Sequence, residues 1–440
     1  MAGGSFTSQN KIRPGAYINF KSVSKPSGAV GVRGISTMPL VLGWGPADKL
    51  IVINSSDLSD GKLVEKIGYY GYESEITPIR EALRNSYKLL LFRIDSNGQK
   101  ATASISPLNI VAKYPGLVGN RLSIVIKELD DSNFEVKTLL DTKIVDSQIG
   151  ANVEDLNNND WVDFAGTGEL VANAGTKLTN GSNGTENAEN YSKYLALVGN
   201  KIFNTMGVHT SNRTVKEKVT QFIKQCRENK GKNVQAVLND YVDANYEGII
   251  SVDQGYITKD EVIGVDGFVG YVTGLTAGAA LNESNTYKVI TGAIDIINPK
   301  TDEEIEEGIK KGKFMISFRQ DESIVVETDI NTFTEFTLDK SRDFSKNRII
   351  RTLDDINNSI KNKFEKTYIG KISNNADGRT AFKSDIIAYL KELNKMGAID
   401  EFKNEDIVIN QGEDIDSVVV SVGVKPIDAM EKLYMTVLVG

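Results

Sequence analysis

The sequence predicts an α/β (α+β) protein with a mixed-sheet core domain covered by helices, a small β-rich domain inserted into that core, and an extended strand arm at each end. Three observations predict this organisation. Strand and helix patterns alternate over most of the chain, helical periodicity stops between about residues 96 and 185, and short strand patterns lie close to both ends. The length of 440 residues also exceeds the usual size of a single hydrophobic core.

These observations divide the chain into five segments. The N-terminal arm is expected at residues 1–25 and the C-terminal arm at residues 422–440. The core domain has two parts, 26–95 and 186–421, and the inserted β-rich domain lies between them at 96–185.

The first part of the core ends in a strand with a clear pattern. Lys88–Ile94 is almost continuously apolar, as expected for a central strand covered on both faces. The other elements predicted in this part are strands at Leu40–Pro46 and Lys49–Ile53 and helices at Asp57–Ile67 and Glu75–Asn85.

The inserted domain is predicted from short alternating runs with Asn, Asp and Gly clustered between them, a pattern typical of strands joined by turns. The runs are Ala101–Ile105, Arg121–Leu129, Phe134–Leu140 and Trp161–Ala165. Asn180–Gly184 is expected to be the linker that leads back to the core.

The second part of the core resumes the alternation of strands and helices. A Thr followed three residues later by Glu marks a helix start, and the pairs are Thr214/Glu217, Thr258/Glu261 and Thr301/Glu304. Candidate strands are Met206–His209, Val234–Leu238, Ile249–Val252, Phe314–Phe318 and Ser323–Thr328. Two longer helices are predicted from apolar stripes that begin at Ile349 and at Phe382, and Gly397 is expected to end the second.

Three glycines recur at every fourth position of one predicted helix. Gly270, Gly274 and Gly278 would form a stripe of small residues along it. We expect this stripe to let another element pack close to the helix, with phosphate binding as the weaker alternative.

Both ends of the chain carry strand patterns that need a partner. Pro14–Phe20 lies near the start, and Ser417–Val422 and Met430–Val439 lie near the end. Terminal strands must find an edge in their own sheet or in another subunit, because their N–H and C=O groups need partners. Two such arms favour a protein joined to copies of itself. The residues expected in these contacts are Pro14, Tyr17, Ile18, Phe20, Pro426, Leu433, Tyr434, Met435, Val437 and Val439.

Composition narrows the functional classes. The net charge of −8 argues against nucleic-acid binding, because phosphate contacts need a basic surface. Neither an export signal nor a run long enough to span a membrane is apparent, so we expect synthesis in a reducing cytoplasm without membrane insertion. The single cysteine, Cys226, excludes an internal disulfide.

Motifs for catalysis, cofactor binding or metal binding are not apparent. His209 is the only histidine and has no triad signature around it, and Cys226 falls on the apolar face of its predicted helix. No phosphate-binding loop of the Gly-x-x-x-x-Gly-Lys type is present. The acidic pairs Asp130/Asp131 and Asp354/Asp355 are interpreted as solvated faces rather than cation sites.

One stretch departs from the acidic average. Arg342–Lys371 holds eight basic and four acidic residues on a predicted helix whose apolar stripe would face the core. We expect its basic side to face outward, either as an ordinary solvated surface or as a docking strip for an acidic partner.

Several motifs, in their order along the chain, resemble contractile phage tail sheath proteins, above all those of Gram-positive phages, defective prophages and phage-tail-like bacteriocins. The resemblance extends over essentially the whole chain. The motifs are Pro14–Tyr17, Lys113–Gly116 with Gly119–Asn120, Leu275–Ala280 with Asn282–Tyr287, Tyr368–Lys371 and Val424–Tyr434.

The resemblance implies a structural protein without cofactors. Subunits of such sheaths stack around an inner tube and shorten on triggering, which drives the tube through a cell envelope. The arms would add strands to sheets of neighbouring subunits, the core would form the wall, and the inserted domain would decorate the outside. Implied partners are further copies of the chain, the inner tube protein, and baseplate and tail terminator proteins, within a virion or phage-tail-like particle assembled in the bacterial host cytoplasm.

The resemblance also gives the basic stretch a candidate role. A helix on the inner side of the sheath contacts the tube in the extended state. We therefore assign Arg348, Arg351, Lys361 and Lys363 as candidate tube-facing residues.

Two alternatives remain. An α/β enzyme with an inserted β domain would need a nucleophile elbow or a paired acid and base, which the sequence does not display. Another self-assembling lattice protein, such as one on a cell surface, would need an export signal.

Overall fold

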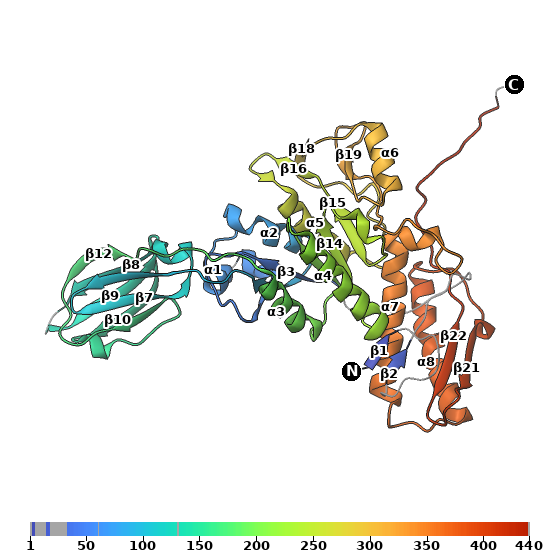
Figure 1. The fold of residues 1–440 in the computed structure, drawn as a ribbon, viewed down its shortest axis with the longest axis horizontal. Coiled ribbons are helices and arrows are strands. Elements are labelled where there is room, and N and C mark those ends of the chain that lie inside the picture. Colours follow the sequence, from blue (N-terminus) through green and yellow to red (C-terminus); the bar gives the residue numbers. More distant parts are fainter. Residues whose placement is uncertain (1, 5–14, 18–32, 60, 130–131, 439–440) are drawn as a thin grey trace. The chain divides into compact units, whose positions relative to one another are not determined.

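The computed structural model separates into two compact units, each described by itself (Figure 1). It describes residues 2–4, 15–17, 33–59, 61–129 and 132–438. Unit 1 comprises Met1–Ser36, Glu81–Tyr87 and Ile202–Gly440, and unit 2 comprises Thr37–Arg80 and Lys88–Lys201. The pattern of helices, a mixed sheet and a separate β sandwich confirms the predicted α/β fold class.

Three strands and the helices α1 and α3 form the part of unit 2 outside the sandwich, together with the first residues of α2, whose last three residues belong to unit 1. The strands lie in the order β3–β5–β4, and β4 is antiparallel to β5. These elements are β3 (Ile35–Leu40), β4 (Leu50–Asn54), β5 (Lys88–Arg93), α1 (Lys62–Ile67), α2 (Thr77–Leu83) and α3 (Ala188–Gly199). Helix α3 packs on the strands through Tyr194, whose hydroxyl lies 2.9 Å from Thr37 Oγ1. The predicted central strand at Lys88–Ile94 is confirmed, whereas the strand expected at Leu40–Pro46 ends where it was expected to begin.

The inserted domain is a β sandwich of a four-stranded and a three-stranded sheet. The orders are β10–β9–β8–β12 and β11–β7–β6, with every ladder antiparallel. The strands are β6 (Lys100–Ile105), β7 (Leu108–Pro115), β8 (Leu122–Glu128), β9 (Phe134–Leu140), β10 (Lys143–Gly150), β11 (Val162–Ala165) and β12 (Asn173–Lys177). The four predicted strands are confirmed, whereas β7, β10 and β12 were not predicted.

The return path from the sandwich is a paired segment, unlike the linker expected at Asn180–Gly184. Its backbone pairs antiparallel with the path that enters the sandwich, through bridges between Ser96 and Thr185 and between Gln99 and Ser182. At its base Asp95 accepts hydrogen bonds from the Leu42 and Gly184 amides. Two strands held together by backbone bonds therefore connect the sandwich to the rest of unit 2.

Unit 1 is built on three parallel strands in the order β15–β14–β13, with α4 and α5 packed against them (Figure 1). These elements are β13 (Thr205–Val208), β14 (Gln235–Asn239), β15 (Ile249–Val252), α4 (Arg213–Lys224) and α5 (Val265–Gly278). A second, antiparallel sheet and a hairpin adjoin helix α6. They are β17 (Val262–Ile263), β16 (Gly255–Thr258) and β18 (Ala293–Ile297), the hairpin β19 (Ile316–Phe318) and β20 (Ile324–Val326), and α6 (Asp302–Lys310).

Of the three predicted capping boxes, one is confirmed. Thr301 accepts a hydrogen bond from the Glu304 amide and Glu304 bonds back to Thr301, which begins α6. Asn212, rather than Thr214, caps α4. Thr258 instead closes the turn from β16 to β17, so α5 begins only at Val265. A Thr three residues before a Glu also serves tight turns, which explains the wrong prediction at Thr258. At Thr214 the helix start is confirmed and only the capping residue differs, because Asn212 is an equally good N-cap two residues earlier.

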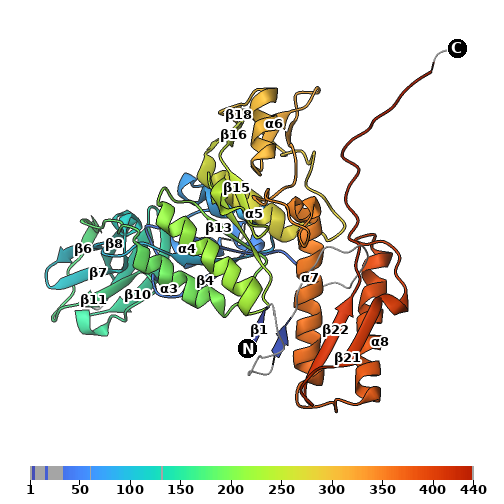
Figure 2. The same cartoon turned by 45° about the vertical axis from the view of Figure 1, so that its right-hand side comes forward.

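The last part of unit 1 places two long helices beside a two-stranded sheet (Figure 2). They are α7 (Asn347–Lys363), α8 (Ala376–Lys395), β21 (Ile407–Gln411) and β22 (Val418–Val422). The predicted stripe on α8 is buried at Phe382, Ile386, Leu390 and Leu393, and Gly397 lies just beyond the helix with φ of +70°. Near the start of the chain, β1 (Ala2–Gly4) pairs in parallel with β2 (Gly15–Tyr17).

Gly274 and Gly278 allow the close approach predicted for their helix. A Cβ at Gly274 would overlap the carbonyl oxygen of Ala82, and one at Gly278 would overlap that of Asn85. Both obstacles are backbone atoms of a segment packed on α5, so they cannot move aside as a side chain can. The contacts confirm the packing interpretation for these two glycines.

Substitution of these glycines should test the close approach. We expect Gly274→Ala to lower the free energy of unfolding by about 1–3 kcal/mol, because overpacking forces backbone shifts. Gly308→Ala in α6 is the matched control, because its new Cβ would meet only the flexible end of Met315. Denaturant unfolding should show the control within about 1 kcal/mol of the parent. Equal losses in both variants would contradict the backbone contact.

Candidate assembly surfaces

The C-terminal segment is docked along its first part and free beyond it. The amide of Asp400 donates to the Lys425 carbonyl at 3.1 Å, and the Ile427 amide donates to the Ala398 carbonyl at 3.0 Å. Pro426, expected in an inter-subunit contact, forms a β-bridge with Ile399 of its own chain. The docked segment, 424–431, is called the root of the arm below.

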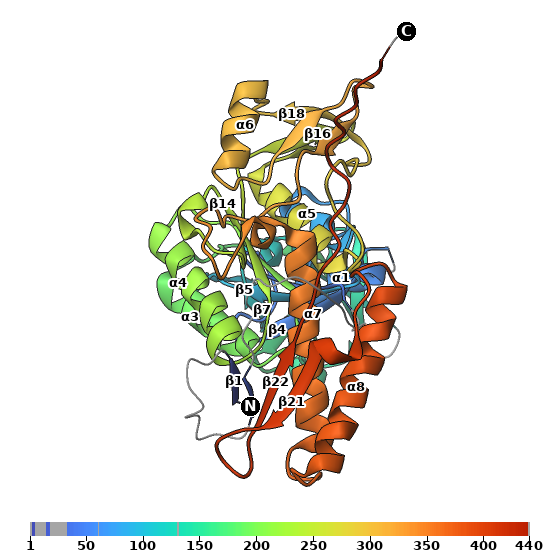
Figure 3. The ribbon, with the colours of Figure 1, turned by 90° about the vertical axis from the view of Figure 1, so that its right-hand side faces the viewer.

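Beyond the root the chain extends clear of the other described elements of unit 1 (Figure 2), although it overlaps α7 and α5 in the projection of Figure 3. Residues 432–438 form no strand, unlike the strand expected at Met430–Val439, because the described residues offer no edge beside them. Their apolar side chains are 69–91% exposed at Leu433, Tyr434, Met435, Val437 and Leu438. Five such side chains in seven residues form an apolar segment of the kind that marks an interaction site. These seven residues are called the free arm.

The hairpin β21–β22 packs one face on α8 and leaves strand edges open. Ile407 and Ile409 of β21 and Val420 and Val422 of β22 contact the core of α8 around Leu390. In the described part of the chain, the only ladder in this sheet joins β21 to β22. Each strand therefore keeps one edge without a ladder, and an incoming strand could use it.

Part of the predicted N-terminal arm is described. Gly15–Tyr17 of the predicted strand forms β2, which runs next to α7, while β1 runs next to the π-helical turn Gln225–Asn229. Pro14, Ile18, Phe20 and, at the other end, Val439 lie outside the described residues.

Only part of the basic stretch faces outward, and three of the four candidate tube-facing residues do not. Arg351 is fully buried, Arg348 is 8% exposed, and Lys361 is 9% exposed. Only Lys363 among the four candidate tube-facing residues is exposed, with a 3.0 Å ion pair to Asp385. The helix is therefore buried on more than one face, and its basic side chains as well as its apolar ones lie in the interior.

The buried basic side chains belong to a polar network along α7. Arg351 Nη2 donates to Asp329 Oδ2 at 2.9 Å and to the Glu283 carbonyl at 2.7 Å. Further hydrogen bonds to Asp329 come from the Asn285 amide and from Asn347 Nδ2, each at 3.0 Å. Burial by itself would raise the pKa of Asp329, but the Arg351 charge and these bonds outweigh it and hold the pKa below its usual value.

A second buried pair corrects another expectation. Asp354 and Asp355 were interpreted as solvated, yet they are 4% and 6% exposed. Asp354 Oδ2 accepts a hydrogen bond of 2.8 Å from Arg227 Nη1, and Arg227 Nη2 forms an ion pair with Asp354 Oδ1 at the same distance. Asp130 and Asp131, the other acidic pair, lie outside the described residues.

The described residues do not assemble a catalytic centre. His209 lies at the exposed end of β13, and Cys226 is buried in the core, where desolvation raises the pKa of its thiol. Across residues 33–59, 61–129 and 132–438, no three metal-ligating side chains gather, and no helix has the length and apolar character to cross a bilayer.

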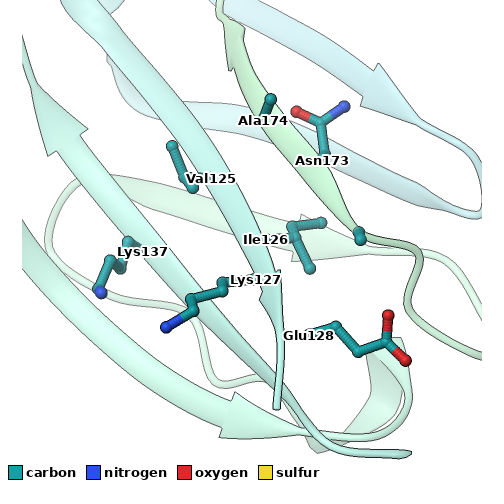
Figure 4. Close-up of a pocket in the computed structure, with 8 residues that line it drawn as sticks. Val125, Ile126, Lys127, Glu128, Lys137, Asn173 and Ala174 are labelled. Atoms are coloured by element: carbon teal, nitrogen blue, oxygen red, sulfur yellow. The ribbon is translucent and has the colours of Figure 1, made fainter.

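A shallow groove of about 420 Å³ lies between β8 and β12 of the sandwich (Figure 4). It forms where their ladder shifts register after Asn173. Its lining includes Val125, Lys127 and Lys137 but offers no buried polar side chain that could orient a ligand. We therefore base no site on this groove.

Models of phage tail sheath domains match the chain in four consecutive segments. The descriptions are tail sheath protein Gp18 domain III N-terminal region for residues 33–94, phage tail sheath protein beta-sandwich domain for 96–183, phage tail sheath protein central domain for 184–332, and phage tail sheath C-terminal domain for 339–440.

Individual proteins are similar over almost the full length. XkdK of the phage-like element PBSX and YqbK, both from Bacillus subtilis, are 32% and 33% identical over 99% of this chain and 99% of their own. The sheath tail protein of Desulfitobacterium hafniense is 38% identical, with 96% of this chain and 99% of that chain covered and a TM-score of 0.85. The Listeria innocua sheath tail protein Lin1278 is 30% identical over 93% of this chain and 96% of that chain, with a TM-score of 0.77.

The buried network predicts different outcomes for two basic residues of the same helix. Arg351→Met should lower the free energy of unfolding by about 3–5 kcal/mol, because it leaves Asp329 buried without its charge partner. Lys363→Met, the control, removes an exposed pair and should cost less than about 1 kcal/mol. Denaturant unfolding of the two variants measures both values. Similar stabilities would show that the Arg351 pair does not hold this part of unit 1 together.

Proposed function

This chain belongs to the phage tail sheath protein family and is a subunit of a contractile tail sheath, and we propose that its free arm joins it to the sheet of a neighbouring copy. It is a structural protein and not an enzyme, and it is a component of the sheath of a phage tail or phage-like particle. The resemblance inferred from its motifs is confirmed.

One observation carries the coupling proposal: five of the seven residues 432–438 are apolar and exposed, and the segment forms no ladder with any described strand. A strand that leaves its own subunit without an edge gains backbone hydrogen bonds and apolar burial by pairing with another sheet. Leu433, Met435 and Val437 alternate, so they would share one face of the added strand.

The open edges of the β21–β22 sheet are the acceptor that we propose. Its inner face already packs on α8 through Ile409 and Val420, so a third strand would continue an existing apolar layer. The short strands β1 and β2 would contribute the N-terminal side of the same coupling, through Tyr17 and its neighbours Pro14, Ile18 and Phe20.

The remaining partners follow from the sheath role. We propose that copies polymerise around an inner tube, end at a baseplate and a tail terminator, and assemble in the host cytoplasm before contraction drives the tube through an envelope. Similar folds occur in the contracted helical sheath of the anti-feeding prophage, 12% identical with a TM-score of 0.56. Contraction itself needs interfaces with two stable arrangements.

The basic surface that we now propose for the tube lies at the end of α7. Lys363, Lys366 and Lys371 are exposed there, whereas Arg348, Arg351 and Lys361 are buried. An exposed cluster of lysines can attract an acidic surface and release it again, because such contacts are individually weak.

Removal of the chain from Lys432 onward tests the coupling. We expect a truncated subunit with the thermal stability of the full chain, because the apolar side chains of the free arm are at least 69% exposed. We also expect a loss of tubular polymers in electron micrographs. Polymers as abundant as those of the parent would contradict the proposal.

A single substitution in the free arm tests the proposed backbone pairing without removing the arm. Thr436→Pro removes one backbone donor in the middle of the free arm and should abolish polymers without destabilising the monomer. Thr436→Ser is its control and should polymerise normally.

Charge removal tests the tube contact separately. Lys363→Gln, Lys366→Gln and Lys371→Gln together should leave sheath polymerisation intact and reduce co-sedimentation with purified tubes, most clearly at low salt. A variant with Glu303→Gln, Glu306→Gln and Glu307→Gln on the exposed face of α6 controls for altered surface charge. Undiminished tube binding by the lysine variant would place the tube contact elsewhere.

A further inference from the structure

We propose that Glu431 is the fixed pivot of the C-terminal arm, and that its bonds to Lys346 and Thr286 set how far the arm can reach. The inference rests on the proposed coupling of copies through the free arm. It concerns the three residues that decide where the docked root ends and the free arm begins, and these are called the clasp.

The clasp holds both oxygens of one carboxylate. Thr286 Oγ1 donates to Glu431 Oε1 at 2.7 Å, and the Lys346 ammonium donates to Glu431 Oε2. Asp428 Oδ2 lies 3.7 Å from the same ammonium. The Glu431 and Lys346 side chains are only 14% and 17% exposed, so solvent screens this pair less than an ordinary surface pair.

The transition from held to free chain occurs at this residue. Lys432, next along the chain, is exposed, and Leu433 is 82% exposed. Residues between Pro426 and Glu431 have no backbone ladder in the described structure apart from the Ile427 amide bond. The clasp is therefore the last side-chain attachment of the root.

The clasp is connected by hydrogen bonds to the buried network of α7. Thr286 Oγ1 accepts a hydrogen bond from the Asp329 amide at 2.9 Å. Lys346 immediately precedes Asn347, which donates to Asp329 Oδ1 at 3.0 Å. Since Asp329 is paired with Arg351 in the core, a pull on the arm would be transmitted to buried, paired residues and would not peel the root away.

Release of the clasp would lengthen the arm. The four residues from Asp428 to Glu431 would join the free chain, and each adds at most about 3.3–3.6 Å, or about 14 Å together. A longer tether lowers the effective concentration of the arm at a neighbouring edge and no longer fixes the spacing between copies. The clasp thus acts as a positioning device for assembly.

Double electron–electron resonance can measure the pivot in the monomer. Spin labels at Lys432→Cys and Ser384→Cys, the second on the exposed face of α8, are specific because the native Cys226 is buried. The parent should give a narrow distance distribution. Lys346→Met and Glu431→Gln, combined in one chain, should lose the narrow distribution, whereas Lys425→Met, which removes the exposed pair with Asp400, should keep it.

Electron microscopy of polymers separates this inference from the coupling on which it rests. The clasp variant should show thermal unfolding like the parent but polymers with irregular spacing between copies. Regular polymers from the clasp variant, or a narrow distance distribution, would overturn the pivot while leaving the coupling intact. Normal polymers from Thr436→Pro would instead overturn the coupling.

Discussion

The buried pair of Arg351 and Asp329 is the interaction on which the C-terminal half of unit 1 depends. Two unit charges removed from water need each other and additional hydrogen bonds, because an unpaired buried charge is strongly destabilising. Asp329 obtains those bonds from the Asn285 amide and Asn347, which fixes the start of α7 against the segments before it. The root of the arm, through Glu431, is attached to the same group of residues.

The interior of unit 1 and the groups proposed for assembly are therefore held by different kinds of contact. Inside unit 1, a buried ion pair holds α7 and close glycine contacts hold α5. The groups proposed for assembly are instead strand edges and an arm with few contacts of its own. Contraction needs subunits that keep their fold while their contacts change. A core held by directional bonds meets the first requirement, and the proposed backbone pairing between copies would meet the second.

The sequence allowed prediction of the fold class, the inserted β domain and most strands, because continuous apolar runs such as Lys88–Ile94 depend on local pattern. It also identified the free arm by its apolar residues without a following partner. Sequence-based prediction failed where contacts between distant segments determine burial. The charges of Arg348, Arg351 and Lys361 suggested a solvated face, but these side chains are buried. Their partners come from segments distant in sequence or from an adjacent turn. Strand β21, interrupted by polar residues at its end, and the clasp residue Glu431 carried no distinct local signal.

The paired connection of the sandwich has a consequence for how the chain could be shortened. Ser96 and Thr185 are backbone neighbours, so the polypeptide enters and leaves the sandwich at one point. A short turn could join these two residues and would leave the order of β5 and α3 along the chain unchanged. The sandwich is therefore a single insertion, and the chain path through the rest of unit 2 does not depend on it.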